Sequence, residues 1–523
     1  MSGGGRTEKS LWNVLTGVFG QLLSFVLSFI IRTVFINTLG EVYLGLNGLY
    51  TNILSVLNLA ELGLGTAIVI ELYRTVANCD EEKTRQYLQL YRKAYFVIGA
   101  VILTAGLALT PFLQYLIKDT ESLSLINYRL VFILYLVNTV FSYFSFAYRE
   151  SVLQANQTEY RARIVTYAFK ILEMLLQIVF LTVFKNIYVY LIIPLVLGCV
   201  STVVKGVLIG RWYPYIKEKP EGSLSKAEVK ETAKNIGAVS MYKLSGCVIN
   251  STDNIILSSM ISLVITGLYS NYLVITSAVS TILEKLFSAF TASLGNLNVE
   301  AGDDKEKKYG IFKTLSFMNF WAYGFAAACF FALFDPFIRV WIGEKYVLNT
   351  VTEAVIAANF LISGLEETVN THRGAYGLFY AGRYRPLFSV ALNIVSSIWF
   401  VRIMPDEYGV AAVLCGTVLS NLAAAWWFDA LILYRRAFGR SPASFYGTFW
   451  LRFLYVSACG CGLRALCSLV RLPAFAAFMV DAVLCVVIYN ALFILLFHKK
   501  AEFRYLWNSV RGILQKLLKR RAQ

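Results

Sequence analysis

The 523-residue sequence is poor in charge and nearly lacks histidine. Charged residues make up only 15% of it, whereas soluble globular proteins carry about 25%. Its two histidines leave little capacity for general acid–base catalysis. There is no Gly-Lys dipeptide, which excludes the phosphate-binding loop of nucleotide hydrolases, and neither an H-E-x-x-H nor a G-x-S-x-G motif occurs. We therefore expect a protein that is not an enzyme and that needs no cofactor or metal.

The nine cysteines include no C-x-x-C pair, and all but Cys79 lie in apolar stretches. This pattern is typical of small buried residues and not of a disulfide framework or a zinc site. Apolar side chains, in contrast, are abundant and account for 57% of the residues. A soluble core could not hide this much apolar surface, whereas lipid can face it directly. The composition therefore predicts an all-α polytopic membrane protein.

Fourteen apolar segments are long enough to cross a bilayer, which takes about 20 helical residues. They span residues 11–37, 43–73, 92–117, 124–148, 163–185, 187–211, 233–260, 264–298, 312–334, 347–373, 384–403, 408–434, 444–469 and 473–498. Most of the 48 lysines and arginines fall in alternate loops and in the two tails. The positive-inside rule assigns these regions, and with them both termini, to the cytoplasm. Because the net charge of +16 is distributed in this way, it does not indicate a nucleic-acid partner.

The segments divide into two lobes joined by a polar connection. Residues 213–232 are rich in proline, glycine and lysine, a composition typical of a linker. We expect six helices in an N-terminal lobe over 1–212 and six in a C-terminal lobe over 233–440. The pentapeptides GLYTN (Gly48–Asn52) and GLYSN (Gly267–Asn271) lie at corresponding places in the second and eighth segments. They predict two pseudo-symmetric lobes, a common transporter plan, and residues 441–498 add two extra helices.

Residues 499–523 form a basic tail with a helical pattern. Its apolar residues recur at three- and four-residue spacing, and lysine and arginine fill most of the other face. Such a helix lies on the cytoplasmic leaflet and is attracted by anionic membrane lipid, which is thus an expected partner. A purely structural anchor is the simplest interpretation of this tail.

Charged side chains within the apolar segments are candidate sites, since such groups are costly in lipid unless they face a partner or a wet cavity. Arg32 in the first segment and Asp253 in the seventh lie at similar depth. They either line one cavity from the two lobes or form a structural ion pair. Glu61 and Lys243 fall near mid-membrane, where neither reaches water easily, and this favours a cavity.

Further charges in the membrane have simpler explanations. Lys170 and Glu173 are three residues apart on one helix face and could neutralise each other, or they could serve transport. Asp429 lies near the inner membrane edge, together with Lys205, Glu284 and Lys285. Snorkelling towards water is the simplest expectation for these four side chains.

The inner half of the tenth segment gathers titratable residues. Glu366 and Glu367 lie close to His372 and Arg373 in the sequence. A protonatable carboxylate near a histidine could couple transport to protons. A salt bridge that closes a gate explains the same residues equally well.

The repeated pentapeptides place an aromatic ring and an amide in each lobe: Tyr50 with Asn52, and Tyr269 with Asn271. Stacked rings and amides are groups that hold sugars in sites of mixed polarity. Polar side chains also bond helices to one another in lipid. Both interpretations stay open at this point.

Four strings resemble polysaccharide-biosynthesis flippases of the MOP superfamily, which also holds the MATE multidrug exporters and the lipid II flippases. The strings are IRTVFINTLGEVYLGLNGLYTNILSVLNLAELGLGTAI (Ile31–Ile68), QANQTEY (Gln154–Tyr160), TDNIILSSMISLVITGLYSNYL (Thr252–Leu273) and HRGAYGLFYAGRYRP (His372–Pro386). The resemblance covers about residues 10–440.

The resemblance implies two six-helix lobes that open alternately to each side around a cationic cavity. It implies that Arg32 belongs to this cavity, since an arginine of the first helix does so in the family. Arg373, Arg383 and Arg385 fall in the family's tenth-helix and following-loop strings, at the cytoplasmic mouth. A basic mouth of this kind would attract phosphate.

The leading hypothesis is a flippase for undecaprenyl-diphosphate-linked oligosaccharides in the bacterial cytoplasmic membrane. Polysaccharide-assembly enzymes are then further candidate partners. The alternative within transport is a cation-coupled exporter of small molecules of the MATE type. A membrane glycosyltransferase or polymerase is a weaker alternative, because the external loops are too short to fold into a catalytic domain.

Overall fold

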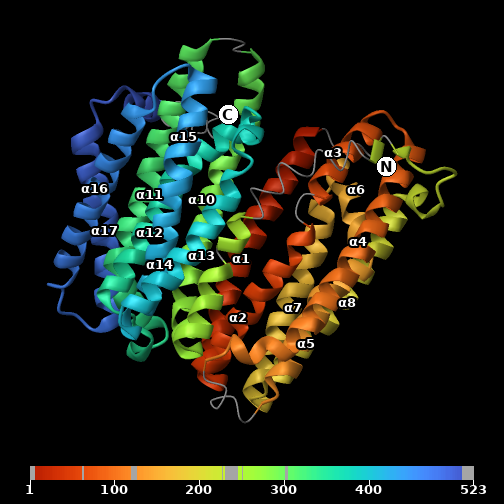
Figure 1. The fold of residues 1–523 in the computed structure, drawn as a ribbon, viewed down its shortest axis with the longest axis horizontal. Coiled ribbons are helices and arrows are strands. Elements are labelled where there is room, and N and C mark those ends of the chain that lie inside the picture. The colour runs from red at the N-terminus through yellow and green to blue at the C-terminus, as the bar shows by residue number, and fades with distance from the viewer. Residues whose placement is uncertain are drawn as a thin grey trace, which may run out of the picture. The chain divides into compact units, whose positions relative to one another are not determined.

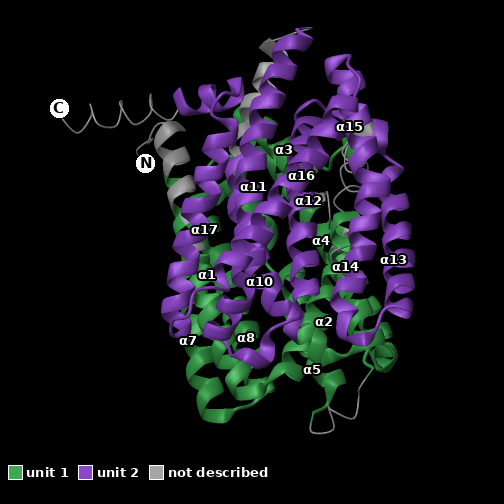
Figure 2. Cartoon of the chain, turned by 90° about the vertical axis from the view of Figure 1, so that its left-hand side faces the viewer, with its two compact units in different colours: residues 1–267 green, residues 268–523 purple. Residues whose placement is uncertain are grey.

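The computed structural model describes residues 6–61, 64–118, 126–226, 228–229, 245–249, 251–300 and 304–508. These residues form helices joined by short connections and contain no strand, which confirms the predicted all-α polytopic class. The chain divides into two units, residues 1–267 and 268–523, and each is described by itself (Figures 1 and 2). Both are bundles of long apolar helices.

Unit 1 begins with the helices α1 (Arg6–Leu39) and α2 (Glu41–Leu57). It continues with α3 (Leu64–Ala77), α4 (Glu81–Leu109), α5 (Tyr128–Phe144), α6 (Glu150–Ala155), α7 (Tyr160–Phe184) and α8 (Ile187–Trp212). Helix α1 packs on α7, α7 on α8, and α5 on both α4 and α8. A core of buried aliphatic and tyrosine side chains fills the space between α2, α4 and α5.

The second predicted segment, 43–73, is broken and not continuous. A 3₁₀ turn, η1 (Asn58–Glu61), separates α2 from α3. Asn58 and the two nearby glycines of the sequence have low helix propensity, so interrupting the helix here costs little conformational free energy. Helix α2 has 17 residues and α3 has 14, and each alone is shorter than a bilayer requires.

Unit 2 contains the greater part of α10 (Leu263–Glu300), followed by α11 (Lys305–Trp341), α12 (Thr350–Ala375) and α13 (Arg385–Ile403). Next come α14 (Gly409–Ser420), the π-helical segment η10 (Asn421–Trp426), α15 (Trp427–Leu433) and a second π-helical segment, η11 (Tyr434–Phe438). The unit ends with α16 (Ala443–Cys467) and α17 (Ala474–Phe497). The last two helices both pack on α11, and α13 packs on α14.

Every predicted segment has helix in the described residues. Among these residues, nine helices are long and apolar enough to cross a membrane, or ten when the bent pair Tyr128–Phe144 and Ala147–Ala155 is taken as one span. The broken second segment and the charged helix α12 are not among them. A multi-pass membrane protein follows from these spans, while the full count of fourteen remains a prediction.

A close contact explains why the end of the seventh segment belongs to unit 1. The backbone of α2 meets the start of α10 at Gly45, where an added Cβ would lie 1.9 Å from the carbonyl oxygen of Leu263. The amide of Lys118 also donates to the carbonyl of Ser258 at 3.1 Å. The two compact units therefore meet at residue 267, and not at the expected linker 213–232. The expected division into two repeated lobes at that linker remains a prediction.

The predicted linker folds back onto the start of α4. Glu82 accepts hydrogen bonds from the amides of Glu221 (2.8 Å) and Gly222 (3.3 Å), and it also pairs with Arg85 at 2.8 Å. Arg85 pairs in addition with Glu218. The connection is thus anchored by backbone and charge contacts, although its composition is that of a loop.

Candidate functional site: a polar cluster in unit 1 and an ion-pair recess in unit 2

Arg32 lies in unit 1 among helices α1, α7 and α8. The guanidinium interacts electrostatically with Tyr190 of α8, whose ring also packs edge-on against Phe35 at 4.9 Å. Glu173 of α7 interacts with the same tyrosine and forms an ion pair of 2.6 Å with Lys170. The structure therefore links Arg32 and Glu173 through Tyr190, and Lys170 joins them as the ion-pair partner of Glu173. The sequence predicted Arg32 and Lys170 as cavity residues and allowed a Lys170–Glu173 pair, but it did not predict Tyr190.

Other polar side chains extend this cluster. Gln177 donates to the carbonyl of Tyr190 at 3.2 Å. Tyr135 of α5, which interacts electrostatically with Tyr190, donates to Asn47 of α2 at 2.6 Å. We call Arg32, Asn47, Tyr135, Lys170, Glu173, Gln177 and Tyr190 the unit 1 polar cluster. All of these side chains except the buried Gln177 are half-buried, so the cluster has an accessible side within an otherwise apolar bundle.

Glu61 lies at the break between α2 and α3. The hydroxyls of Tyr95 and Tyr143 both donate to its carboxylate, and Tyr91 donates to Tyr95 at 2.9 Å. Two helices, α4 and α5, thus supply the two hydroxyl groups that donate to this acid. This explains how the chain tolerates a carboxylate there, and it gives Glu61 a structural role at the helix break.

The repeated tyrosine and asparagine residues are mostly packed inside their units. Tyr50 is fully buried and donates to the carbonyl of Tyr128 at 2.8 Å, while Asn52 donates to Gly48 of its own helix at 2.7 Å. Tyr269 and Asn271 are also buried. The bond of Tyr50 joins α2 to α5, whereas that of Asn52 stays within α2, so the choice between helix packing and sugar binding remains open.

The seventh segment contains two further predicted cavity residues, Asp253 and Lys243. Asp253 is buried in unit 1, the same unit that contains Arg32. Lys243 lies outside the described residues.

The predicted cytoplasmic mouth contains a buried ion-pair triad in unit 2. Asp429 of α15 binds both Arg373 of α12 and Arg385 of α13. Only 3% of Asp429 is exposed, and Arg373 is fully buried. The expectation that Asp429 snorkels to water is therefore wrong, because two arginines from neighbouring helices neutralise it inside the bundle. The signals in the sequence were an acid inside one apolar segment and arginines at the ends of two earlier segments.

Lys205 also has a partner, since it pairs with Glu150 at 2.6 Å and does not simply snorkel.

The remaining mouth residues occupy different surroundings. His372 is buried, with Nδ1 at 2.8 Å from the carbonyl of Thr368 and its ring 5.1 Å from that of Phe312. Glu367 accepts from Thr371 at 3.2 Å. Arg383 lies over the ring of Tyr384 at 4.8 Å. These contacts of the three residues are with groups outside the triad.

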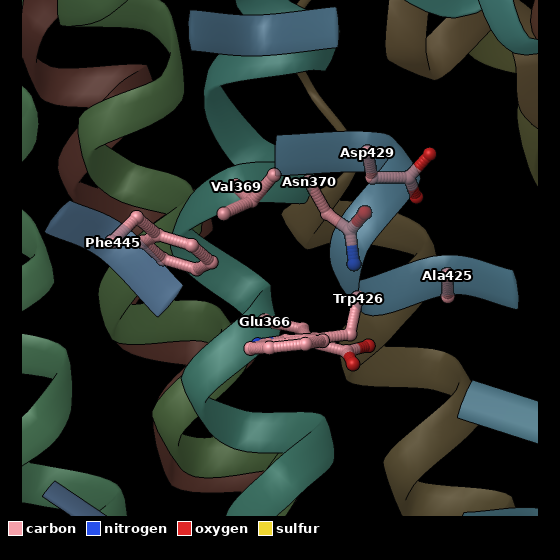
Figure 3. A pocket seen from close by; sticks show the side chains of 7 residues that line it. All are labelled: Glu366, Val369, Asn370, Ala425, Trp426, Asp429 and Phe445. Atoms are coloured by element: carbon pink, nitrogen blue, oxygen red, sulfur yellow. The ribbon is translucent and has the colours of Figure 1, made fainter. Parts of the chain in front are cut away.

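Glu366 lines a recess beside the triad (Figure 3). The recess is too narrow to hold a water molecule and is lined by Glu366, Val369, Asn370, Ala425, Trp426, Asp429 and Phe445. Its walls come from α12, from η10 with α15, and from the start of α16. The recess therefore joins two carboxylates that are far apart in the sequence.

A second buried acid was missed by sequence reasoning. Glu353 of α12 is fully buried and accepts from Arg464 of α16 at 2.7 Å and from Tyr272 of α10 at 3.2 Å. Arg464 also donates to the carbonyl of Phe331 at 2.8 Å. An arginine within an extra helix and an acid at the start of an apolar segment were the signals for this pair.

Comparison with solved structures identifies the fold. The chain is similar to the lipid II flippase MurJ in an inward closed conformation, with a TM-score of 0.64, 14% identity, and coverage of 93% of this chain and 99% of that one. It is also similar to an inward-facing multidrug resistance MATE family transporter of the MOP superfamily, with a TM-score of 0.55, 16% identity, and coverage of 83% and 95%. The chain has the fold of the MOP superfamily.

A mutant of the Vibrio cholerae MATE transporter VcmN gives a similar result, with a TM-score of 0.51, 14% identity, and coverage of 83% of this chain and 98% of that one. No protein-family model and no curated protein matches the chain. These solved structures are of transporters and of a flippase, and at these identities the likeness concerns the fold alone. The likeness supports the predicted all-α polytopic class, while the predicted division into two six-helix lobes remains a prediction.

Proposed function

We propose that this protein is a flippase that moves undecaprenyl-diphosphate-linked oligosaccharides across the bacterial cytoplasmic membrane by alternating access. The proposal includes both termini in the cytoplasm and the use of the carrier lipid as substrate. The observation that carries it is the unit 1 polar cluster. Its cation, amides and tyrosine hydroxyls are the groups that a charged, sugar-bearing head group requires in an apolar bundle.

The fold supports the same function. The MurJ structure covers 93% of this chain, whereas the inward-facing MATE structure covers 83%. A protein with two helices beyond the twelve of the lobes is closer in organisation to a flippase of lipid-linked substrates. The sequence strings favour the polysaccharide branch over lipid II itself.

A cation-coupled exporter of small molecules is the second candidate. The observation that favours it is Glu366 at the recess in unit 2, since Asp429 in the same recess is already neutralised by two arginines. A cationic drug would bind to acids, whereas a diphosphate would bind to Arg32. The charge that interacts with the substrate therefore distinguishes the two functions.

The remaining partners are also proposals. The basic tail after His498 would bind anionic lipid on the cytoplasmic leaflet, and its described part, residues 501–508, is helical with stacked rings of Phe503 and Trp507. Polysaccharide-assembly enzymes would supply the substrate on one side and use the product on the other.

The test is the sidedness of the lipid-linked glycan. Cells depleted of the protein are expected to accumulate oligosaccharide that a non-permeant glycosidase cannot reach. Complementation with Arg32→Ala is expected to leave membrane insertion intact and to reduce accessible glycan at least about 10-fold, the effect of about 1.4 kcal/mol of lost binding.

Arg74→Ala is the matched control, because Arg74 is an exposed arginine that pairs only locally with Glu71. Normal surface glycan in the Arg32→Ala variant would show that Arg32 is not part of the substrate site. Unchanged sidedness in depleted cells would reject the flippase and lead to a dye-efflux assay.

A further inference from the structure

The recess of unit 2 contains polar atoms that the ion-pair triad does not use. Among the residues that the structure describes, Glu366 Oε1, Asp429 Oδ1 and Trp426 Nε1 are buried without a hydrogen-bond partner. All three residues line the recess (Figure 3). An ionised carboxylate oxygen without a donor is unfavourable by several kcal/mol in such a place. The recess is therefore adapted either to take up a ligand or to hold one acid in its neutral form.

The chemistry of the walls favours a proton over a metal cation. Hard cations require several oxygen ligands, and the described ranges contain no group of three histidine, cysteine or acidic side chains arranged to hold a metal. Arg373 and Arg385, which bind Asp429, would repel a cation at the same place. A proton needs only one carboxylate oxygen and removes the cost of an unpaired charge.

Three charged groups would respond to the charge on Glu366. Arg385 of α13, Asp429 of α15 and Glu367 of its own helix all interact with it electrostatically. Glu367 in turn faces Glu284 of α10. The other walls, formed by Trp426 and Phe445, are neutral. An ionised Glu366 is thus attracted by Arg385 and repelled by Asp429, so the two carboxylates compete for one guanidinium.

The helical segment that carries Asp429 has irregular turns on both sides. Helix α15 has seven residues and lies between the π-helical segments η10 and η11. The wider turns of π-helical segments occur often at functional sites, and they permit a change of register that a continuous α-helix resists. Asp429 therefore lies between two irregular turns of one continuous 33-residue helical span, Asp406–Phe438.

We propose that this recess is a proton-binding switch. With a proton on Glu366, Asp429 holds Arg385, which is the arrangement in the structure. When the carboxylic acid releases its proton to solvent, the carboxylate attracts Arg385 away from Asp429, and α15 shifts between its π-helical segments. The switch is a property of unit 2 and does not depend on which substrate is transported.

Trp426 provides a local reporter, because its indole lines the recess. The experiment is a pH titration of tryptophan fluorescence on the purified, detergent-solubilised full chain without substrate. The contribution of Trp426 is obtained as the difference between the parent and Trp426→Phe. We expect a single-proton transition in this difference signal. Glu366→Gln is expected to abolish it, and the neighbouring Glu367→Gln is expected to keep it with a midpoint at lower pH, because one repelling charge is removed.

Each outcome is decisive. A transition that persists in Glu366→Gln, or that is missing from the parent, overturns the switch. A sodium-dependent signal at constant pH that Glu366→Gln abolishes would assign the recess to an alkali cation instead. If Glu366→Gln does not fold, Glu366→Asp must keep a transition with a shifted midpoint, and an unshifted midpoint contradicts the proposal. Because no substrate is present, a failed glycan assay leaves these results unaffected.

Discussion

Arg464 of α16 donates a 2.7 Å hydrogen bond to Glu353 of α12, an acid with no exposed surface. The same guanidinium bonds the carbonyl of Phe331 in α11, so one side chain of the first extra helix joins two helices of the preceding bundle. Arg452, also in α16, bonds Ser316 of α11 at 2.7 Å in a similar way. The extra helices are therefore tied to unit 2 by charged groups as well as by apolar packing.

Arg464→Ala is expected to lower the free energy of unfolding of unit 2 by about 3 kcal/mol, because it leaves Glu353 buried without its positive partner. Thermal unfolding in detergent, followed by the loss of monodisperse protein, measures the effect. The double variant Arg464→Ala/Glu353→Gln should recover much of the loss, since no buried charge then remains. Equal loss in the single and double variants would show that Arg464 acts through packing alone.

Tyr95→Phe and Tyr143→Phe are each expected to cost about 1 kcal/mol, because each removes one hydroxyl that donates to Glu61. Glu61→Gln should make both substitutions nearly neutral, since an amide oxygen needs these donors less. Tyr115→Phe, at a tyrosine that is 71% exposed, serves as the control. Thermal stability of the purified variants gives the comparison, and additive losses in the Glu61→Gln background would contradict the coupling.

Gly45→Ala is expected to destabilise unit 1 by at least about 2 kcal/mol, because the added methyl group would overlap the backbone of Leu263 and only a helix displacement could relieve it. Gly48→Ala, one turn later on α2, should be tolerated, since its Cβ would meet only a methyl group of Thr266 at 3.9 Å. Yield and melting temperature of the two variants make a matched pair. Equal behaviour would show that the contact between α2 and α10 is loose.

Much of the fold follows from the sequence because its determinant is simple: long apolar segments in lipid must be helical. The helix break at Asn58 and the π-helical segments beside Asp429 could not be predicted in this way. Both depend on contacts between segments distant in the sequence, such as those of Tyr95 and Tyr143 with Glu61, and hydropathy carries no information about them.

The candidate sites show the same difference between features visible in the sequence and features that depend on distant contacts. Arg32 and Glu366 were found from the sequence, since a charge inside an apolar segment is conspicuous by itself. The identity of their partners was not, because Tyr190 and Trp426 look like ordinary membrane aromatics in the sequence. Asp429 was misinterpreted for a related reason: depth along a helix does not reveal which face carries the arginines of its neighbours.

The linker offers a pH-dependent prediction outside the membrane. The amide and hydroxyl of Ser225 both donate to Glu228, which lowers the pKa of this carboxyl below its usual range, and Lys83 pairs with it at 3.4 Å. Because the pKa of Glu228 is lower in the folded state, the ionised carboxylate contributes to the stability of the folded linker at pH values above its pKa in the unfolded chain. This contribution is lost as the pH falls through the lowered value.

Limited proteolysis across residues 213–229 should accordingly accelerate as the pH falls below about 4. An acid-active protease keeps the measurement feasible, and its rate on an unfolded peptide corrects for its own pH profile. Glu228→Gln should be cleaved faster than the parent at neutral pH and should show little further change on acidification. A parent rate that is flat with pH would contradict the role of Glu228.

The π-helical segments on either side of α15 also have a consequence for how related sequences should be aligned. A π-helical turn holds one residue more than an α-helical turn, and the usual origin of such a turn is a single-residue insertion. Relatives in which α14 and α15 form one regular helix should therefore align with this chain only through one-residue gaps within 421–426 and within 434–438. An alignment forced through without these gaps would pair Asp429 with a residue on the wrong face of the helix, and the acid would be overlooked.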